Sequence, residues 1–408
     1  MECIEERRSA RLRGVLAMVV AALVLATAFT ACGGSNSDGD SAGTSDGGTI
    51  AYGVITPFTG SYAAYGMPEK ASVEAAVNAV NAQGGIKVGG KTYKLEAKAY
   101  DSGFDPSKAV TEARRAITQD GVRYLEILGG ELIPPVQPVA GDNALIFGVA
   151  NGSTFLGADQ PTTFRAWYDL PTSVAASLRY LKPKLGTDSP RVVMLYPEGA
   201  RGKELSAASG KRAEELGYSA TTTFTDPSAT DFTAVLTKVL GDKPDVIDFG
   251  FTSPSAYAVA VKQARQLGYK GRFVFPDTLV QSVLNKTAGK GAAAGSVTSP
   301  LFTSFSTPAG RKWAQYVEDR SGPLQGWAAV SYDNVFLLKA AIEQAQSLEP
   351  TKVAKALLQV RLDHGLLGQV RYEQRPEVHD GYTMVGIKYP VGELTADGRV
   401  KTVASYVG

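Results

Sequence analysis

The chain contains very little cysteine and histidine, and this scarcity excludes several kinds of chemistry. Its 408 residues include 2 cysteines and 2 histidines. No HExxH sequence occurs, and no cysteine pair has the spacing of metal ligands. His364 and His379 lie outside any catalytic pattern and are interpreted as surface or hydrogen-bonded polar residues. We therefore expect no enzymatic activity, no metal ion and no cofactor.

The sequence also lacks an excess of either charge. Lysine and arginine together number 42, aspartate and glutamate 40, and the net charge is +2. No basic block occurs beyond the N-terminus, so we expect no nucleic-acid partner. The hydrophobic fraction of 44% and the charged fraction of 20% are ordinary for a globular protein, and the length allows two or three domains.

Residues 1–31 have the organisation of a signal peptide. Four arginines at positions 7, 8, 11 and 13 precede residues 15–31, which form an uncharged, mostly apolar run of seventeen residues. A transmembrane anchor is the alternative, but the run is short for a span. It also ends in Thr30-Ala31-Cys32 rather than in a positively charged stop. The pattern therefore favours export and cleavage.

The residues Phe29-Thr30-Ala31-Cys32 resemble the lipobox of bacterial lipoproteins, with Phe29 where that family usually has leucine. The resemblance implies cleavage before Cys32 and a lipid on its sulfur, which would anchor the protein to the membrane on its extracytoplasmic side. Residues 32–48 are rich in glycine and serine and predict a flexible linker. An ordinary signal peptide with an incidental cysteine is the alternative. The mature chain would have no second thiol, so no disulfide can form.

From Thr49 onward, predicted strands alternate with predicted helices. Short apolar runs predict strands at 49–57, 93–101, 123–130, 144–150, 191–197, 219–226, 245–252 and 271–277. Apolar residues at helical spacing follow most of them, and Asp105-Pro106 and Pro68 are placed in first turns. This alternation predicts an α/β protein of two doubly wound parallel-sheet lobes.

Ligands of such sheets bind beyond the carboxyl ends of the strands. The loops that follow the predicted strands are therefore the candidate site, and they span residues 58–66, 129–135, 150–154, 197–202, 251–257 and 276–282.

Five segments carry a resemblance that covers nearly all of residues 49–389. They read ITPFTGSYAAYG, NAVNAQGGI, DPSKAVTEARRAITQD, VKQARQLGYKG and AVSYDNVFLLKAAIEQA. In this order they resemble the solute-binding proteins of branched-chain amino-acid ABC transporters, which have the type I periplasmic-binding fold. The resemblance implies a monomer that captures a small molecule between two lobes and delivers it to an ABC permease. A sensor of the same fold that feeds a signalling partner is the alternative.

The same resemblance implies three chain crossings between the lobes. We place them near residues 165–167, near 299–301 and near Gly368. Lobe I then comprises residues 49–166 and 301–367, and lobe II comprises 167–300 and 368–408.

Ligand contacts are carried over only where the loops align. In lobe I the resemblance implies contacts from Tyr65 and from the residues after two strands, Ile133, Ala150, Asn151, Gly152 and Ser153. Family members usually have serine hydroxyls where this chain has Ile133-Pro134-Pro135, and proline has no N–H to donate. In lobe II and at the first crossing it implies contacts from Trp167, Arg201, Thr252 and Asp277.

Two of these positions bear on the ligand. Asp277 aligns with a family acid that pairs with the ligand ammonium, and Arg201 stands where an aromatic residue is common. Because the residues that grip a carboxylate are altered, amino acids, small carboxylates, amides and aromatic acids all stay open as ligands.

Overall fold

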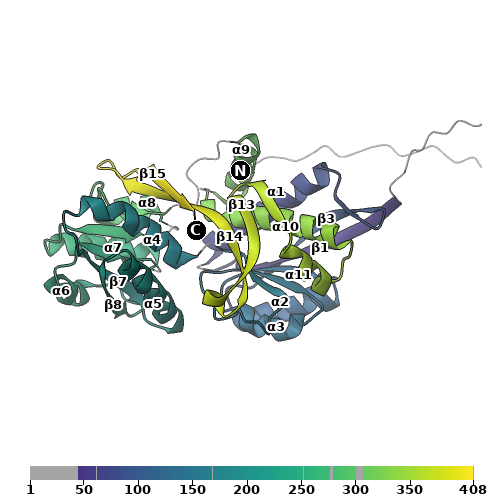
Figure 1. Cartoon of the computed structure of the whole chain (residues 1–408), viewed down its shortest axis with the longest axis horizontal. Helices are drawn as coiled ribbons and strands as arrows, with labels where there is room; N and C mark the ends of the chain where they lie inside the picture. The colour runs from purple at the N-terminus through teal and green to yellow at the C-terminus, as the bar shows by residue number, and fades with distance from the viewer. Residues whose placement is uncertain are drawn as a thin grey trace, which may run out of the picture. The chain divides into compact units, whose positions relative to one another are not determined.

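A computed structural model describes residues 45–408 apart from 61, 168, 251, 276–278, 300–306, 323 and 408. Within this part, strands and helices alternate as predicted (Figure 1). The strands are β1 (Ser45–Thr56), β2 (Ile86–Val88), β3 (Lys91–Asp101), β4 (Tyr124–Leu128), β5 (Leu145–Val149), β6 (Thr163–Arg165), β7 (Arg191–Pro197), β8 (Ser219–Thr225), β9 (Val246–Asp248), β10 (Arg272–Phe275), β11 (Val297–Thr298), β12 (Arg361–Gly365), β13 (Gly368–Arg375), β14 (Gly381–Leu394) and β15 (Val400–Val407).

The helices of the described part fill the intervals between these strands. They are α1 (Ala63–Ala82), α2 (Pro106–Thr118), α3 (Ile133–Ala140), α4 (Leu170–Leu181), α5 (Ala200–Glu215), α6 (Thr233–Gly241), α7 (Pro254–Gln266), α8 (Gln281–Ala288), α9 (Pro308–Ser321), α10 (Ala329–Ala345) and α11 (Pro350–Leu357), with short 3-10 turns at Lys182–Lys184, Gly326–Ala328 and Pro376–Val378.

The strands form two parallel groups that share β14. The hydrogen-bonded order is β2-β3-β1-β4-β5-β6-β14-β11-β10-β9-β7-β8. We call β1–β6, β12 and β13 the first group, and β7–β11 and β15 the second group. β14 is parallel to β6 and antiparallel to β11, so it belongs to both. This arrangement confirms the predicted α/β class with parallel sheets.

Apolar side chains alternate between the two faces of the first group. Tyr52 and Val54 of β1 pack in a core with Val73 of α1, whereas Ile55 packs in another with Ala113 of α2. Figure 1 shows α2 and α3 on one side of these strands and α1 and α10 on the other. The strands are therefore buried on both faces, as parallel strands usually are.

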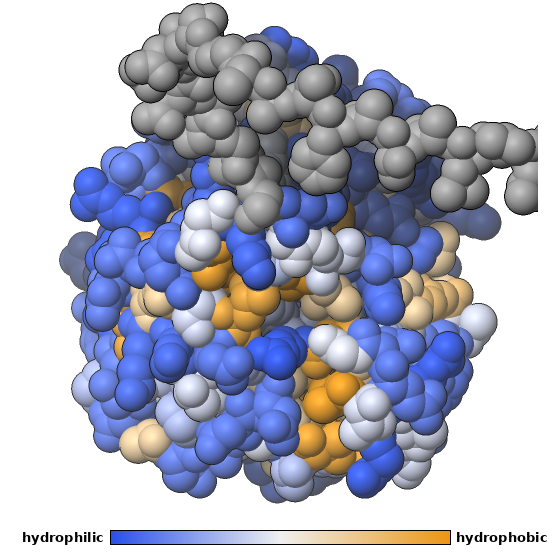
Figure 2. All heavy atoms as spheres, turned by 90° about the vertical axis from the view of Figure 1, so that its right-hand side faces the viewer, coloured by the Kyte–Doolittle hydropathy of each residue, from blue (hydrophilic) through white to orange (hydrophobic). Residues whose placement is uncertain are grey.

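Large apolar side chains are seldom exposed among the described residues. Those that are at least a third exposed are Tyr62, Leu267, Leu358 and Val403. The face seen in Figure 2 is mostly hydrophilic, with hydrophobic side chains in separate groups that hydrophilic ones divide.

Two local predictions about helix starts meet different outcomes. The side chain of Asp105 accepts a hydrogen bond from the Lys108 N–H at 2.8 Å, which confirms the predicted cap. Pro68, however, lies inside α1 and not in its first turn, because the chain already turns at Tyr62 and the helix begins at Ala63. The predicted 129–135 loop is also shorter than expected, since α3 begins at Ile133 with prolines in its first turn.

Two expected boundaries differ from the observed strand pairing. β1 begins at Ser45, which pairs with Lys91, so the predicted linker overlaps the first strand. β13 pairs with β12 and with the first half of β14, so residues 368–375 belong with the first group. The change from pairing with the first group to pairing with the second group therefore lies within β14, whereas we expected the third crossing near Gly368. The reason is that β12 and β13 form a hairpin on the first group before the chain crosses.

The chain segments near the other crossings bond to β14. Arg165 Nε donates to Thr383 Oγ1 at 2.8 Å, and the Asp169 N–H bonds the Tyr389 hydroxyl at 3.0 Å. Ser299 Oγ donates to the Pro390 carbonyl at 2.8 Å. These bonds hold the described parts of all three connections together.

A buried pair of acids lies within the first group. Glu69 of α1 and Glu126 of β4 are fully buried. Thr56 Oγ1 donates to Glu69 Oε2 at 2.8 Å and Tyr52 OH donates to Glu126 Oε2 at 2.8 Å, whereas Oε1 of each carboxyl group has no hydrogen-bond partner among the described residues. Two buried carboxylates repel each other, so the pair favours a state that keeps a proton. Burial, and then repulsion from Glu126, raise the pKa of Glu69 well above its ordinary value of 4.5.

Glycines in the first turns of two helices permit close contacts with the preceding strands. A Cβ on Gly66 of α1 would lie 1.8 Å from the Pro57 carbonyl oxygen, and one on Gly202 of α5 would lie 1.9 Å from that of Pro197. Both prolines stand at the carboxyl end of a strand, one directly after β1 and one ending β7. The absent side chains let each helix start directly above the end of its strand.

We predict that Glu69→Gln makes stability less dependent on pH. Above pH 4.5 the folded pair keeps a proton that the unfolded chain releases, so this part of the stability is lost as pH rises through the elevated pKa. An amide at this position is uncharged at every pH and needs no such proton. Each unit of elevation corresponds to ~1.4 kcal/mol, so the fall in unfolding free energy from pH 5 to pH 8 should shrink by about 1 kcal/mol or more. Denaturant unfolding of both proteins at pH 5 and at pH 8 measures this fall in unfolding free energy.

The control for this substitution is Glu96→Gln on β3, whose carboxylate is exposed. It removes the same charge and should leave the pH dependence as in the wild type. If the unfolding free energy of Glu69→Gln fell with pH as steeply as that of the wild type, the folded pair would not keep the proposed proton.

We also predict that Gly202→Ala destabilises the protein by about 2 kcal/mol or more, because its Cβ meets a backbone oxygen that cannot move without the strand. Gly210→Ala on the same helix is the matched control. A Cβ there would be 4.0 Å from the nearest atom, the Ala220 Cβ, so this change should be neutral or stabilising. Equal melting temperatures for the two variants would refute the steric argument.

Candidate ligand-binding site

The strand order places a topological switch point in each group. β1 lies between β3 and β4, and β7 lies between β8 and β9. At such a point the connections from neighbouring strands leave in opposite directions, which opens a crevice beyond the carboxyl ends. The loops after β1, β4 and β5 and the start of α5 are therefore the places where a ligand would be expected.

The loop after β1 is fixed by Asp101 at the end of the neighbouring strand. Its carboxylate accepts from the Phe58 N–H and Thr59 Oγ1, each at 2.8 Å, and from the Gly103 N–H at 3.0 Å. Lys108 Nζ lies 2.7 Å away. Burial acts to raise the pKa of Asp101, but the bonds from Lys108 and the loop together lower it below its ordinary value. The loop is thus held by an ionised side chain.

Ser153, which follows β5, meets a side chain from the second group. Its backbone N–H donates to Glu204 Oε1 at 3.1 Å, and its hydroxyl donates to the same oxygen at 2.6 Å. Glu204 is on α5, 51 residues further along the chain. The contact brings a predicted site residue of the first group against the helix that follows the predicted 197–202 loop of the second.

A second contact between the groups lies beside the first. Arg201 of α5 pairs with Glu131, which follows β4, with 3.1 Å between Nη1 and Oε1. The arginine side chain is 23% exposed and the glutamate 49%, so the pair is partly solvated and contributes little stability, about 0–1 kcal/mol. Gly130 and Gly152 flank it, since a Cβ on either would lie within 4 Å of the Arg201 side chain.

Aromatic rings lie after β1, after β6 and before α10. The Tyr65 ring lies 6.3 Å from that of Trp327, which lies 5.4 Å from that of Trp167. Both tryptophans are buried, and Tyr65 is half-buried. The Tyr62 ring stacks on Phe104 at 4.1 Å. The structure thus brings the predicted Tyr65 and Trp167 together through a third ring.

The remaining predicted residues have varied surroundings. Ile133 is fully buried in the core beneath α3, and Ala150 is also buried. The Asn151 side-chain oxygen is buried and has no hydrogen-bond partner among the described residues. Thr252 is buried and donates to the Leu195 carbonyl at 3.1 Å, which occupies its hydroxyl. Asp277 and the predicted lipidation site Cys32 lie outside the described residues.

Sequence reasoning missed three residues of this region, Glu131, Glu204 and Trp327. Glu204 stands three residues after Arg201, a spacing that puts both on one helical face, so it could have been found. Glu131 lies within the predicted 129–135 site loop, where its carboxylate was a candidate of its own. Trp327 had no local signal, since it reaches the site from the turn before α10.

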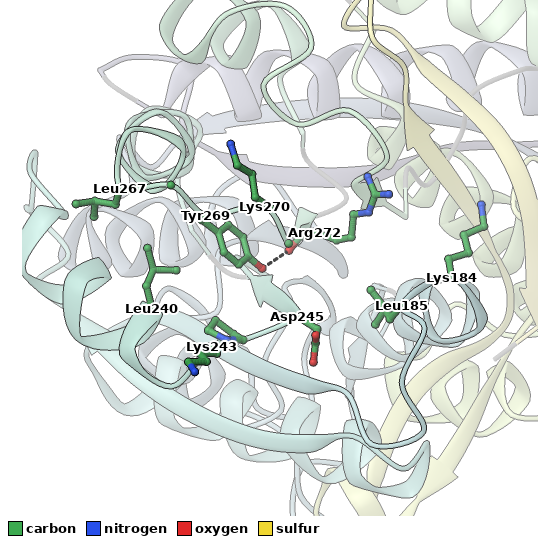
Figure 3. Close-up of a pocket in the computed structure, with 12 residues that line it drawn as sticks. Lys184, Leu185, Leu240, Lys243, Asp245, Leu267, Tyr269, Lys270 and Arg272 are labelled. Carbon is green, nitrogen blue, oxygen red and sulfur yellow. Dashed lines mark hydrogen bonds between the residues drawn. The ribbon is translucent and has the colours of Figure 1, made fainter.

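A hollow of about 490 Å³ lies elsewhere in the second group (Figure 3). It is at the start of β9 and β10, among residues that include Asp245, Tyr269 and Arg272, and the charged ends of Lys184, Lys243 and Lys270 stand around its rim. Arg272 Nη1 is already bonded to the Ala294 carbonyl. Because parallel sheets bind ligands at the opposite edge, we do not assign the ligand site to this hollow.

Two negative findings apply to the part of the chain that the structure describes. No cluster of three or more histidine, cysteine, aspartate or glutamate side chains is placed there to hold a metal ion. No helix there is both long and apolar enough to cross a bilayer.

Comparison with known proteins agrees with this architecture. Residues 49–388 match the family model described as periplasmic binding protein. The Leu/Ile/Val-binding protein BraC3 of Rhizobium johnstonii is 28% identical over 338 residues, covering 79% of this chain and 87% of that protein.

Two solved structures share the fold. A leucine-binding protein, LivK, from Thermotoga maritima has a TM-score of 0.70 at 23% identity, covering 88% of this chain and 99% of its own. An ABC transporter solute-binding protein from R. palustris, in complex with 4-hydroxybenzoate, has a TM-score of 0.72 at 19% identity, covering 88% and 97%. Because residues 49–388, most of the chain, match the family model, this chain belongs to the periplasmic binding protein family.

Proposed function

We propose that this protein is a lipid-anchored, extracytoplasmic solute-binding protein that captures a small molecule between two lobes and delivers it to an ABC importer. The observation that carries the proposal is that side chains from the two strand groups meet beyond the carboxyl ends of their strands. Ser153 and Glu131 come from one group, and Glu204 and Arg201 come from the other.

The mechanism we propose is closure about the three crossings. The strand groups correspond to the two lobes, with the third crossing placed in β14. A ligand that touches both lobes binds the closed form better than the open form and shifts the population toward it. The permease then receives the closed, loaded protein.

The residues proposed to contact the ligand lie on both sides of this crevice. In the first lobe they are Tyr65, Asn151, Gly152 and Ser153, and Trp167 lies at the first crossing. In the second lobe they are Arg201 and Asp277. Ile133, Ala150 and Thr252 shape the surrounding loops, because their side chains are buried.

We predict that a small metabolite stabilises and compacts the protein. A ligand at a hundred times its dissociation constant adds ~2.7 kcal/mol to the unfolding free energy, which a thermal-shift screen detects. The screen should include amino acids, amides, aromatic acids and short-chain acids. Small-angle scattering with a hit should show a smaller radius of gyration. A library without any stabilising compound would contradict ligand capture, and a hit without compaction would contradict closure.

We predict that Cys32→Ala releases the protein from the membrane or blocks its maturation, because the cysteine sulfur carries the lipid in the proposed anchor. Mass spectrometry of the membrane-derived wild type should show a lipid-modified peptide that begins at Cys32. Ser35→Ala, in the predicted linker, is the control and should stay in the membrane fraction. A wild type cleaved elsewhere, with an unmodified Cys32, would rule out the anchor.

A further inference from the structure

The two donors of Ser153 converge on a position suited to a carboxylate. A backbone N–H and a hydroxyl from one residue point to a single oxygen atom, at 3.1 and 2.6 Å. Ionised carboxylates accept such paired donors well. In this protein the oxygen belongs to Glu204, so the protein's own carboxylate occupies the position that a ligand carboxylate would otherwise take.

Two buried acceptors beside this contact lack donors. Oε2 of Glu204 is buried and has no hydrogen-bond partner among the described residues, and the same holds for Oδ1 of Asn151. A Cβ on the intervening Gly152 would lie 3.4 Å from Glu204 Oε2, so the loop after β5 runs directly past this oxygen. A buried acceptor without a donor is unfavourable, and a ligand that supplies N–H groups would relieve it.

The charged side chains near this contact also favour a ligand with N–H donors over a free carboxylate. Arg201 brings a cation to this contact region, and Glu131 lies against it at 3.1 Å. Of the described charged side chains in these two contacts, two are acidic and one is basic. An incoming free carboxylate brings acceptors only, adds a second negative charge, and finds the Ser153 donors already engaged.

We propose that Glu204 determines the ligand class, and this inference rests on the proposed function. The cleft binds a ligand whose group at this end carries N–H donors, an amine or a primary amide, and discriminates against a free carboxylate there. Oxygens of Glu204 and Asn151 accept hydrogen bonds from the ligand. Glu204 also keeps both Ser153 donors engaged, so that a ligand carboxylate cannot accept from them.

The test compares acids with their amides in titration calorimetry on the mature protein. The probes are leucine with leucinamide and 4-hydroxybenzoate with 4-hydroxybenzamide, each pair differing only in carboxylate against amide. The wild type should bind the amide of at least one pair ten times more tightly than the acid. Glu204→Ala frees both Ser153 donors, so it should gain at least tenfold in affinity for that acid and lose affinity for the amide.

Two further variants separate this effect from general electrostatics. Glu131→Gln removes a negative charge from the same cleft but leaves the Ser153 bonds, so its gain for the acid should be less than a third of that in Glu204→Ala. Adding Ser153→Ala to Glu204→Ala should abolish the gain. Two results would overturn the proposal. One is a gain in affinity for the acid that is as large in Glu131→Gln as in Glu204→Ala, and the other is an undiminished gain in the Glu204→Ala, Ser153→Ala double variant.

Failure of this inference is distinguishable from failure of the proposed function. Acids that bind the wild type as tightly as their amides, or a screening hit whose affinity is unchanged in Glu204→Ala, would overturn the role of Glu204 and leave solute binding intact. If neither member of either pair binds the wild type or Glu204→Ala, the role of Glu204 is also rejected. Only a metabolite library without any ligand would remove the solute-binding function itself.

Discussion

The pairing of β14 with strands of both groups is the constraint on which the rest of the structure depends. One continuous strand is parallel to β6 at Tyr382 and antiparallel to β11 at Glu393. Each group therefore keeps its own parallel sheet and its own switch point, while the connections run side by side. The bonds from Arg165 and Ser299 to this strand are where the other two connections are tied to it. A change of angle between the groups must be absorbed in these few residues.

The first group places a rigid polar network beneath the crevice. Asn334 of α10 donates to Glu126 at 2.9 Å and accepts from the Tyr372 hydroxyl at 2.6 Å, so the network joins α10, β4 and β13. Glu69, on the first part of α1, accepts a hydrogen bond from Thr56 at the end of β1. Removing one partner from such a network leaves a buried polar group unsatisfied, which is costly. The loop after β1 thus begins from a fixed point, and Asp101 holds its first residues, Phe58 and Thr59.

The sequence allowed the strand–helix alternation and the loops at the carboxyl ends to be predicted, because both follow from local apolar spacing and from a general property of parallel sheets. The contacts across the crevice could not be predicted in this way. Glu204 and Ser153 are 51 residues apart, and Arg201 and Glu131 are 70 apart, so their meeting depends on how two groups of strands are placed. The third crossing was misplaced for a related reason: the β12–β13 hairpin has no marker in the sequence that assigns it to one group.

The contacts across the crevice also bear on how a binding protein responds to its ligand. Bonds that the protein makes with its own side chains favour closure whether or not a ligand is bound, so they add nothing to the ligand's preference for the closed form. The partly exposed pair of Arg201 and Glu131 contributes only about 0–1 kcal/mol. The unsatisfied oxygens of Glu204 and Asn151 oppose closure by a similar or larger amount, since an unpaired buried acceptor costs roughly 1–3 kcal/mol. Since the penalty of the unpaired oxygens is the larger of these two contributions, the donors that a ligand brings to these oxygens decide whether the closed form predominates.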